Sequence, residues 1–225
     1  MLSEKLAPRV LIWITLALFI TISSGIVIAA RSKLPPPVAI NYIGHPTIGY
    51  TKAKIHVVVF EEPKCSNCRE YSETIFPKIK KEFIDTNKIT YTVIPVSFLP
   101  GSMNAAMALL CVYNADPLYP NSELFFDYLD YMYKNQPSEK IDWATTEKLI
   151  EMAQKTSPAI NPSQLKKCID MQTYRVKIQK NTEYGKKVMG GTISTPTVFV
   201  NGIEVQSLTY NGVRDLINEV AKEAK

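Results

Sequence analysis

Two cysteines that are separated by two residues form the chemically most informative feature of this sequence. Cys65 and Cys68 lie in the stretch FEEPKCSNC, which runs from Phe60 to Cys68. Two thiols at this spacing can bind a metal ion, close a small disulfide or exchange electrons with another protein. The pair alone does not decide among these three kinds of chemistry, so the surrounding elements have to.

A buried strand followed by a helix is predicted to hold the pair. Ile55–Glu62 is a short apolar run rich in β-branched residues, which is typical of a strand buried on both faces. Apolar residues then recur every four positions, at Tyr71, Ile75, Ile79 and Phe83. This spacing indicates a helix, and Pro77 is expected to kink it because proline removes one backbone hydrogen bond.

A cysteine at the start of a helix is placed where its thiolate is stabilised. The helix N-terminus carries unpaired N–H groups and roughly half a positive charge. Because the thiolate is the species that attacks disulfides, we expect Cys65 to be exposed at the helix start and to be the nucleophile. Cys68, one turn further and more buried, is then expected to be the resolving thiol.

Metal binding and a structural disulfide are the alternatives. A zinc site commonly uses two close pairs of ligands, whereas Cys111 and Cys168 stand alone in predicted helices. His45 and His56 are the only histidines, and His56 lies inside the predicted strand, where we expect a structural role. We therefore expect no metal and no cofactor. A structural disulfide across one helical turn would constrain little chain entropy.

The remaining pattern predicts an α/β fold. Ile89–Phe98 is a second strand, and it is followed by about ninety residues of helical periodicity without a strand signal. Two apolar runs in Thr195–Val205 flank Asn201-Gly202, which predicts a type I′ hairpin, and an amphipathic helix ends the chain. The order β-α-β, helical block, β-β-α favours one α/β domain with a helical insertion.

The N-terminal segment predicts export from the cytoplasm. Val10–Ala30 is an uncharged apolar run, and about 20 such residues can span a membrane as a helix. Lys5 and Arg9 precede it, so residues 1–9 are expected in the cytoplasm and the domain in the periplasm. A cleavable signal peptide in place of the anchor at residues 10–30 is the alternative. Residues 31–42 are predicted to form a proline-rich linker.

The combined motifs resemble the thioredoxin superfamily. The shared features are the CxxC at a strand-to-helix junction and the later Thr195-Pro196 before a strand. The helical block between them is similar to that of the DsbA-type oxidoreductases. The resemblance covers residues 43–225 and implies a thioredoxin fold with an insertion at about 101–189. It also implies that Pro196 is cis and that the Thr195 backbone binds substrate.

The resemblance implies a protein thiol–disulfide oxidoreductase that introduces disulfides into reduced or unfolded exported proteins. It further implies a monomer that a DsbB-type membrane oxidase reoxidises. Nothing suggests a nucleic-acid partner, since the net charge of +5 is mild. Strongly oxidising relatives have a histidine between the cysteines, whereas this chain has Ser66-Asn67, so we expect a mild oxidant. A membrane-anchored reductase and a non-catalytic binding module with a structural CSNC disulfide remain alternatives.

Two further features bear on the mechanism. Many relatives carry a buried acid six residues before the first cysteine, but Val59 stands there in this chain. Glu61 and Glu62 are nearer, and they either replace that acid through water or are simply solvated charges. Cys111 and Cys168 fall on apolar helix faces, where they are either small hydrophobic residues or, in an oxidising compartment, partners in a structural disulfide. We predict the disulfide.

Overall fold

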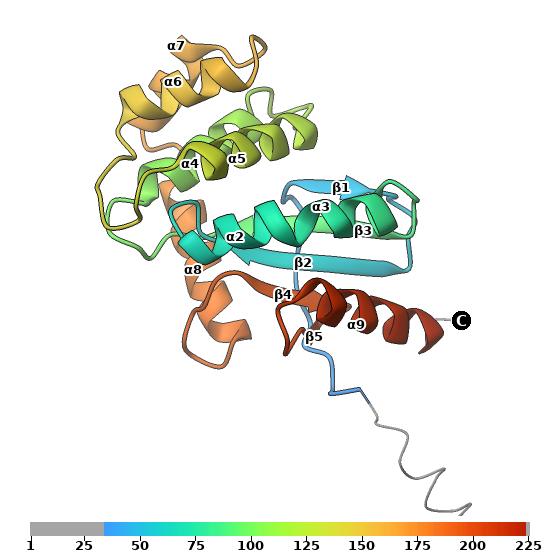
Figure 1. Cartoon of the computed structure of the whole chain (residues 1–225). Coiled ribbons are helices and arrows are strands. Elements are labelled where there is room, and N and C mark those ends of the chain that lie inside the picture. Colours follow the sequence, from blue (N-terminus) through green and yellow to red (C-terminus); the bar gives the residue numbers. More distant parts are fainter. Residues whose placement is uncertain (1–33, 224–225) are drawn as a thin grey trace, which may run out of the picture. The chain divides into compact units, whose positions relative to one another are not determined.

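The framework of the protein is a five-stranded sheet (Figure 1). In the computed structural model, which describes residues 34–223, the strands are β1 (Thr47–Gly49), β2 (Ile55–Glu61), β3 (Ile89–Pro95), β4 (Thr197–Val200) and β5 (Ile203–Glu204). Their spatial order is β1-β3-β2-β4-β5, with β2 parallel to β3 and the other neighbours antiparallel. All of β3 is buried, and so is β2 except for His56, because helices cover both faces of these two strands.

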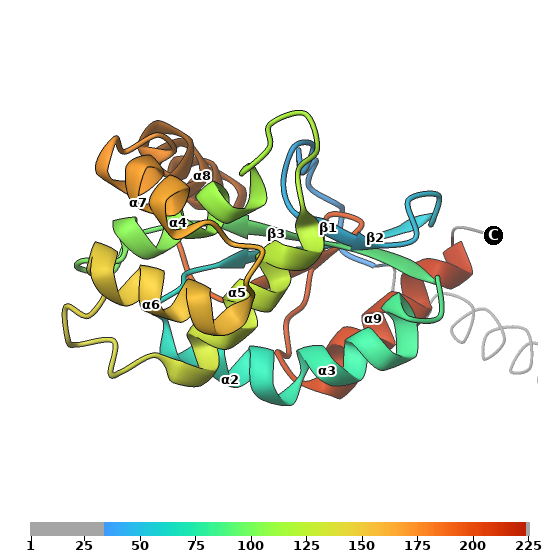
Figure 2. The ribbon, with the colours of Figure 1, turned by 90° about the horizontal axis from the view of Figure 1, so that it is seen from above.

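Helices lie on both faces of the sheet and extend beyond one end of it. One face carries α2 (Ser66–Thr74), α3 (Phe76–Ile79), a π-helical turn (Lys80–Ile84) and α9 (Tyr210–Glu223). The insertion between β3 and β4 consists of α4 (Met103–Tyr113), α5 (Ser122–Asn135), α6 (Thr146–Thr156), α7 (Pro162–Asp170) and α8 (Arg175–Val188). Figure 2 shows α3 and α9 on one side of the sheet and α8 on the other. The predicted thioredoxin-like α/β fold with a helical insertion is therefore present.

The helix after the cysteine pair is interrupted where a kink was predicted. α2 ends at Thr74 and α3 begins at Phe76, with Ile75 between them, and Pro77 occupies the first turn of α3. Proline is tolerated there because N–H groups of the first turn have no partner within the helix. The long helical pattern after Asn161 also divides, into α7 and α8. Asn161 caps α7 by accepting a hydrogen bond from the Gln164 N–H at 3.0 Å.

The insertion has its own buried interior. α4 reads MNAAMALLCVY and is buried almost all round, as expected of a helix that is apolar on every face. α5 instead presents one apolar face, which buries Phe125, Tyr128, Leu129 and Met132.

β1 was not predicted. It is a three-residue strand beside β3, and its Thr47 hydroxyl is hydrogen-bonded to that of Thr92 at 2.8 Å.

The hairpin between β4 and β5 also holds the segment that enters the domain. Asn201 and Gly202 have φ values of 46° and 83°, and a type I′ turn requires both to be positive. The Val38 N–H donates to the Gly202 carbonyl at 2.9 Å, and Ile40 and Tyr42 pack against the sheet. The compact unit accordingly begins at Pro37, within the segment that the sequence analysis assigned to a linker.

The predicted anchor lies outside the part of the chain that the structure describes. Val10–Ala30 precedes the first described residue, and so do residues 1–9. Between residues 34 and 223, none of the helices has both the length and the apolar character that a membrane span requires.

Candidate active site

Cys65 and Cys68 lie at the junction between the central strand β2 and helix α2. Cys65 is the N-cap residue of α2, with extended backbone at φ −69° and ψ 126°, and Cys68 lies in the first turn. Both are unbridged thiols in the structure. Cys68 is fully buried, as expected, but Cys65 is only 8 % exposed. The expectation of an exposed Cys65 was therefore wrong, because segments distant in sequence pack over it.

The two thiols differ in acidity. A hydrogen bond from the Cys68 thiol, followed by hydrogen bonds involving Thr195 and the N–H groups of Cys68 and Asn67, lowers the pKa of Cys65 to about 6 against the opposing effect of burial. Burial, with the loss of the same hydrogen bond on ionisation, raises the pKa of Cys68 well above its usual value. At neutral pH, Cys65 is therefore mainly a thiolate and Cys68 a thiol.

Thr195 lies directly against Cys65, and Pro196 follows it. The peptide bond between Thr195 and Pro196 is cis. When Cys65 is protonated, its Sγ donates to the Thr195 carbonyl oxygen at 3.5 Å, across 130 positions of sequence. The structure thus brings together the four residues Cys65, Cys68, Thr195 and Pro196, although the segment between them contains the whole insertion. The Thr195 hydroxyl is buried beside Cys65 and has no other hydrogen-bond partner.

Glu61 and Glu62 are buried beside the cysteines. They are 4 % and 0 % exposed, so the interpretation of both as solvated charges was wrong. The Tyr133 hydroxyl of α5 donates to Glu61 Oε2 at 2.7 Å, and the Lys64 N–H donates to Glu62 Oε2 at 2.9 Å. Burial raises the pKa of Glu61 to about 7 and that of Glu62 to about 8. The sequence did not reveal this burial because the covering residues come from the insertion.

The segment after α5 contributes two side chains that sequence analysis missed. Glu139 Oε2 accepts a hydrogen bond from the Ser66 N–H at 2.8 Å. Gln136 Nε2 donates to the Cys65 carbonyl oxygen at 3.4 Å. Both lie about seventy residues from the cysteine pair along the chain, so no local motif connects them with it. Only the packing of the insertion on α2 does so.

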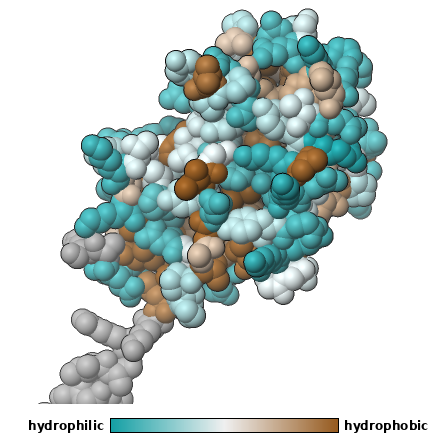
Figure 3. Space-filling model, turned by 180° about the vertical axis from the view of Figure 1, so that it is seen from behind, coloured by the Kyte–Doolittle hydropathy of each residue, from teal (hydrophilic) through white to brown (hydrophobic). Residues whose placement is uncertain are grey.

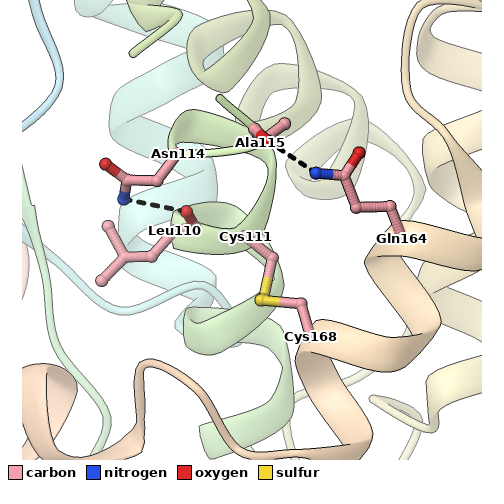
Figure 4. The surroundings of a disulfide bond; sticks show 6 residues. All are labelled: Leu110, Cys111, Asn114, Ala115, Gln164 and Cys168. Atoms are coloured by element: carbon pink, nitrogen blue, oxygen red, sulfur yellow. Dashed lines mark hydrogen bonds between the residues drawn. A yellow bond between two sulfur atoms is a disulfide. The ribbon is translucent and has the colours of Figure 1, made fainter. Parts of the chain in front are cut away.

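The second pair of cysteines forms a disulfide within the insertion. Cys111 of α4 and Cys168 of α7 are bonded, with a Cα–Cα distance of 6.0 Å (Figure 4). A neighbouring hydrogen bond from Gln164 Nε2 to the Ala115 carbonyl, at 2.6 Å, joins the same two regions. This disulfide therefore ties two insertion helices together, whereas Cys65 and Cys68 lie at the end of a sheet strand.

Both histidines pack against neighbouring residues of the fold. His56 Nδ1 is hydrogen-bonded to the Thr90 hydroxyl at 2.6 Å on the adjacent strand. Burial, with the nearby charge of Lys177, lowers the pKa of His45 to about 4. Over residues 34–223, no three histidine, cysteine, aspartate or glutamate side chains gather in a way that could hold a metal ion.

Comparison with known proteins agrees with the fold and the site. The sequence matches the family described as thioredoxin over residues 42–219, and the chain belongs to this family. It is 30% identical over 181 residues to disulfide bond formation protein D of Bacillus subtilis (strain 168), which covers 80% of this chain and 78% of that protein. The predicted membership of the DsbA-like thioredoxin-fold proteins is therefore confirmed.

Two solved structures are closely similar. DsbA of Chlamydia trachomatis matches with a TM-score of 0.76 and 39% identity, over 84% of this chain and 98% of that one. Oxidised BdbD of Bacillus subtilis matches with a TM-score of 0.73 and 29% identity, over 84% of this chain and 97% of that one. Both alignments span nearly the whole of the compared chain, so the likeness extends to the insertion as well as to the sheet.

Proposed function

We propose that this protein is an exported thiol–disulfide oxidoreductase that introduces disulfide bonds into other exported proteins. The observation that carries the proposal is the difference between its two active-site thiols. Cys65 is acidic and is the more accessible of the two, whereas Cys68 is fully buried and strongly favours its protonated form. This difference assigns exchange with substrates to Cys65. Cys68 is its buried partner, which leaves when a substrate attacks and which resolves the mixed disulfide when the reaction runs in reverse. The relatives named as disulfide bond formation proteins support this direction of reaction.

The proposed reaction is two successive thiol–disulfide exchanges. A substrate thiolate attacks Cys65 Sγ of the oxidised protein, so that a mixed disulfide forms and the Cys65–Cys68 bond breaks. Cys68 leaves as a thiolate and takes up a proton. A second substrate thiolate then attacks the substrate sulfur of the mixed disulfide, and Cys65 leaves as a thiolate. The substrate loses two electrons and gains a disulfide, while the protein gains two electrons and becomes the dithiol.

Glu61 is suited to supply and accept the proton of Cys68. The negative charge of Glu61 is among the causes that raise the pKa of Cys68, so the two groups lie within electrostatic reach of each other. Its own raised pKa of about 7 means that the carboxyl is protonated in about half of the molecules at neutral pH. We assign Glu61 to the role that the buried acid plays in relatives. Tyr133 then holds the carboxyl in place through its 2.7 Å hydrogen bond.

Substrate binding is assigned to the cis-proline segment. The Thr195 carbonyl accepts a hydrogen bond from the protonated Cys65 thiol. A chain that reacts at Cys65 must therefore pass beside this segment. The backbone of Thr195 would pair with it as an added strand.

The absence of histidine between the cysteines supports a mild oxidant, and the apolar run at residues 10–30 supports an anchor in the inner membrane. Reoxidation is assigned to a DsbB-type membrane oxidase.

We further propose that the domain acts as a monomer. The face in Figure 3 is mainly hydrophilic, and its apolar side chains form small separate areas. Stable dimers instead bury broad and well-packed contact areas. Sedimentation of the periplasmic domain at micromolar concentrations, with a mass close to that of one chain, is the expected result.

The proposed activity is tested with the oxidised protein and a reduced, unfolded substrate peptide that contains two cysteines. Disulfide formation in the peptide should be lost in both Cys65→Ser and Cys68→Ser, because neither variant can form the Cys65–Cys68 disulfide. When Cys68→Ser is instead incubated with the oxidised peptide, the Cys65 thiolate attacks the peptide disulfide, and mass spectrometry should detect the mixed disulfide. The Cys111→Ala/Cys168→Ala double variant is the matched control, because it removes the other two cysteines. Unchanged peptide oxidation by Cys65→Ser would contradict catalysis and would favour a binding module.

Thiol trapping in the source cells tests the direction of electron flow. An oxidase should be recovered mostly with Cys65 and Cys68 joined, because a membrane partner keeps it oxidised. Recovery mostly as the dithiol would instead indicate the reductase. The fraction modified by an alkylating reagent gives this ratio directly.

A further inference from the structure

The N–H groups at the N-terminal end of α2 donate to two acceptors, the Cys65 sulfur and the Glu139 carboxylate. The N–H groups of Asn67 and Cys68 stabilise the thiolate of Cys65. The N–H of Ser66, the first residue of the helix, instead donates to Glu139 Oε2 at 2.8 Å. A carboxylate and the reactive sulfur therefore share one helix end.

Glu139 reaches this position because the chain turns back after α5. Gln136 has extended backbone and precedes Pro137, as steric contact with the proline ring requires, so α5 cannot continue. The Gln136 side chain holds this segment on the site through its 3.4 Å bond to the Cys65 carbonyl. Hydrogen bonds from the Ser66 backbone and side chain lower the pKa of the partly exposed Glu139 carboxyl. It is therefore charged at neutral pH.

We propose that Glu139 is a positioning residue that lowers the reduction potential of the Cys65–Cys68 pair by placing a negative charge on the first N–H of α2. In the oxidised protein neither sulfur is charged, so the helix end stabilises the carboxylate without opposition. In the reduced protein the Cys65 thiolate lies at the same helix end, and the two negative charges repel each other. Glu139 therefore stabilises the disulfide relative to the dithiol, which makes the protein a milder oxidant.

Most other charged groups around the pair are held by separate contacts, although Lys64 and Lys140 also interact electrostatically with Glu139. Glu61 and Glu62 lie at the end of β2 and bind Tyr133 and the Lys64 N–H. The Lys64 Nζ donates to the Pro100 carbonyl oxygen at 2.7 Å. A substitution at Glu139 leaves these contacts in place, so its effect on Cys65 can be measured separately. The inference rests on the proposed exchange at Cys65 but not on the direction of electron flow.

Glu139→Gln tests the inference because it removes the charge and keeps an oxygen that can accept the Ser66 N–H. The acid dissociation constant of Cys65, measured from thiolate absorbance in the reduced protein, should rise roughly two- to fivefold. The equilibrium with a glutathione buffer should shift toward the dithiol by the same factor, which corresponds to a potential about 10–20 mV more positive. Glu147→Gln, the same change on an exposed glutamate in the first turn of α6, should alter neither quantity.

Ser66→Pro tests whether Glu139 acts through the N–H. Proline is favoured at the first position of a helix, and Cys65 before it already has the extended backbone that proline requires. The variant removes the N–H, so it should shift both quantities in the same direction as Glu139→Gln. In the Ser66→Pro background, Glu139→Gln should produce less than half of its original shift. If Glu139→Gln fails to fold, Ser66→Pro alone still gives the direction.

Three results would overturn the inference. The first is an unchanged acid dissociation constant of Cys65 in Glu139→Gln. The second is an equal change of this constant in Glu147→Gln. The third is an undiminished effect of Glu139→Gln on this constant in the Ser66→Pro background. These outcomes are separate from the test of the proposed function. Loss of that function would appear as normal peptide oxidation by Cys65→Ser, whatever Glu139 does to the potential.

Discussion

At the scale of single residues, the site is governed by which charges are buried. Cys65 is an acidic thiol because several hydrogen-bond donors converge on its sulfur at a helix end. The pKa of Cys68 is instead raised, because this thiol lies inside the protein and the negative charge of Glu61 is within electrostatic reach. One helical turn thus separates a good leaving group from a thiol that must be protonated to remain buried. This contrast suits Cys65 to exchange with substrates and Cys68 to act as its buried partner.

The buried carboxyl of Glu61 predicts a pH-dependent stability. Its pKa is about 7 in the folded protein and 4.5 in the reference state, so the folded state binds the proton more tightly. The free energy of unfolding should therefore fall as pH rises from about 4.5 to 8. Glu61→Gln has no proton to lose, and the Gln oxygen still accepts from Tyr133. It should match the wild type near pH 4 and exceed its stability by about 3 kcal/mol at pH 8.

Urea unfolding at a series of pH values measures this difference. Glu70→Gln, which removes a charge from an exposed position of α2, is the control. Its difference from the wild type should stay within about 0.5 kcal/mol. A Glu61→Gln difference that is the same at pH 4 and pH 8 would show that the Glu61 carboxyl is not held protonated. Slower attack of a substrate thiol on the Cys65–Cys68 disulfide of Glu61→Gln would support the role of Glu61 in proton transfer to Cys68.

At the scale of elements, the β4–β5 hairpin links the entering segment to the sheet. Residues 37–42 pass beside the turn, and a Cβ at Gly202 would lie 2.1 Å from the Val38 carbonyl oxygen. Only glycine therefore fits both the positive φ of the turn and the close approach of this segment. The segment covers apolar side chains of β2 and β4 with Ile40 and Tyr42. Its packing is thus part of the domain's core.

Gly202→Ala should release this segment. The left-handed backbone alone costs an alanine about 1 kcal/mol, and displacement of Val38 should add roughly 1–2 kcal/mol through lost burial and the lost hydrogen bond. Gly190→Ala is the matched control, since Gly190 also has a positive φ but no neighbouring atom lies within 4 Å of where its Cβ would be. Thermal unfolding compares the two variants, and hydrogen exchange at the Val38 N–H shows the release. Equal losses in both variants would argue against the role of this contact.

At the scale of the whole molecule, the insertion completes the site that the sheet begins. Tyr133, Gln136 and Glu139 all come from α5 or the segment after it, and they contact Glu61, Cys65 and Ser66 respectively. Any change that weakens the packing of the insertion should therefore disturb these contacts with the cysteine pair. The Cys111–Cys168 disulfide holds α4 to α7 and opposes such weakening from within the insertion.

Removal of this disulfide should destabilise the protein. The bond closes a loop with a sequence separation of 57, for which the chain-entropy model predicts about 4 kcal/mol of stabilisation. The Cys111→Ala/Cys168→Ala variant should lose most of that value in urea unfolding and still oxidise peptides at temperatures where it stays folded. Alkylation of the oxidised, denatured wild type provides the check. Two alkylated thiols at Cys111 and Cys168 would show that the bond is absent in solution.

The sequence by itself determined the fold class and the location of the redox pair. Strand and helix periodicities, the CxxC after Phe60 and the Asn201-Gly202 turn are local patterns, and each follows from the backbone preferences of neighbouring residues. The break of the helix near Pro77 was predictable for the same reason.

Only the tertiary structure decided which side chains surround the sulfur atoms. Burial of Glu61 and Glu62, the covering of Cys65, and the contacts of Gln136 and Glu139 depend on how an insertion about seventy residues away packs on α2. A charged residue beside a turn is usually solvated, so local reasoning left open whether the glutamates replace the buried acid or are solvated charges. Desolvation depends on every atom nearby, whatever its position in the chain, and this is why the acidities of the site follow from the fold.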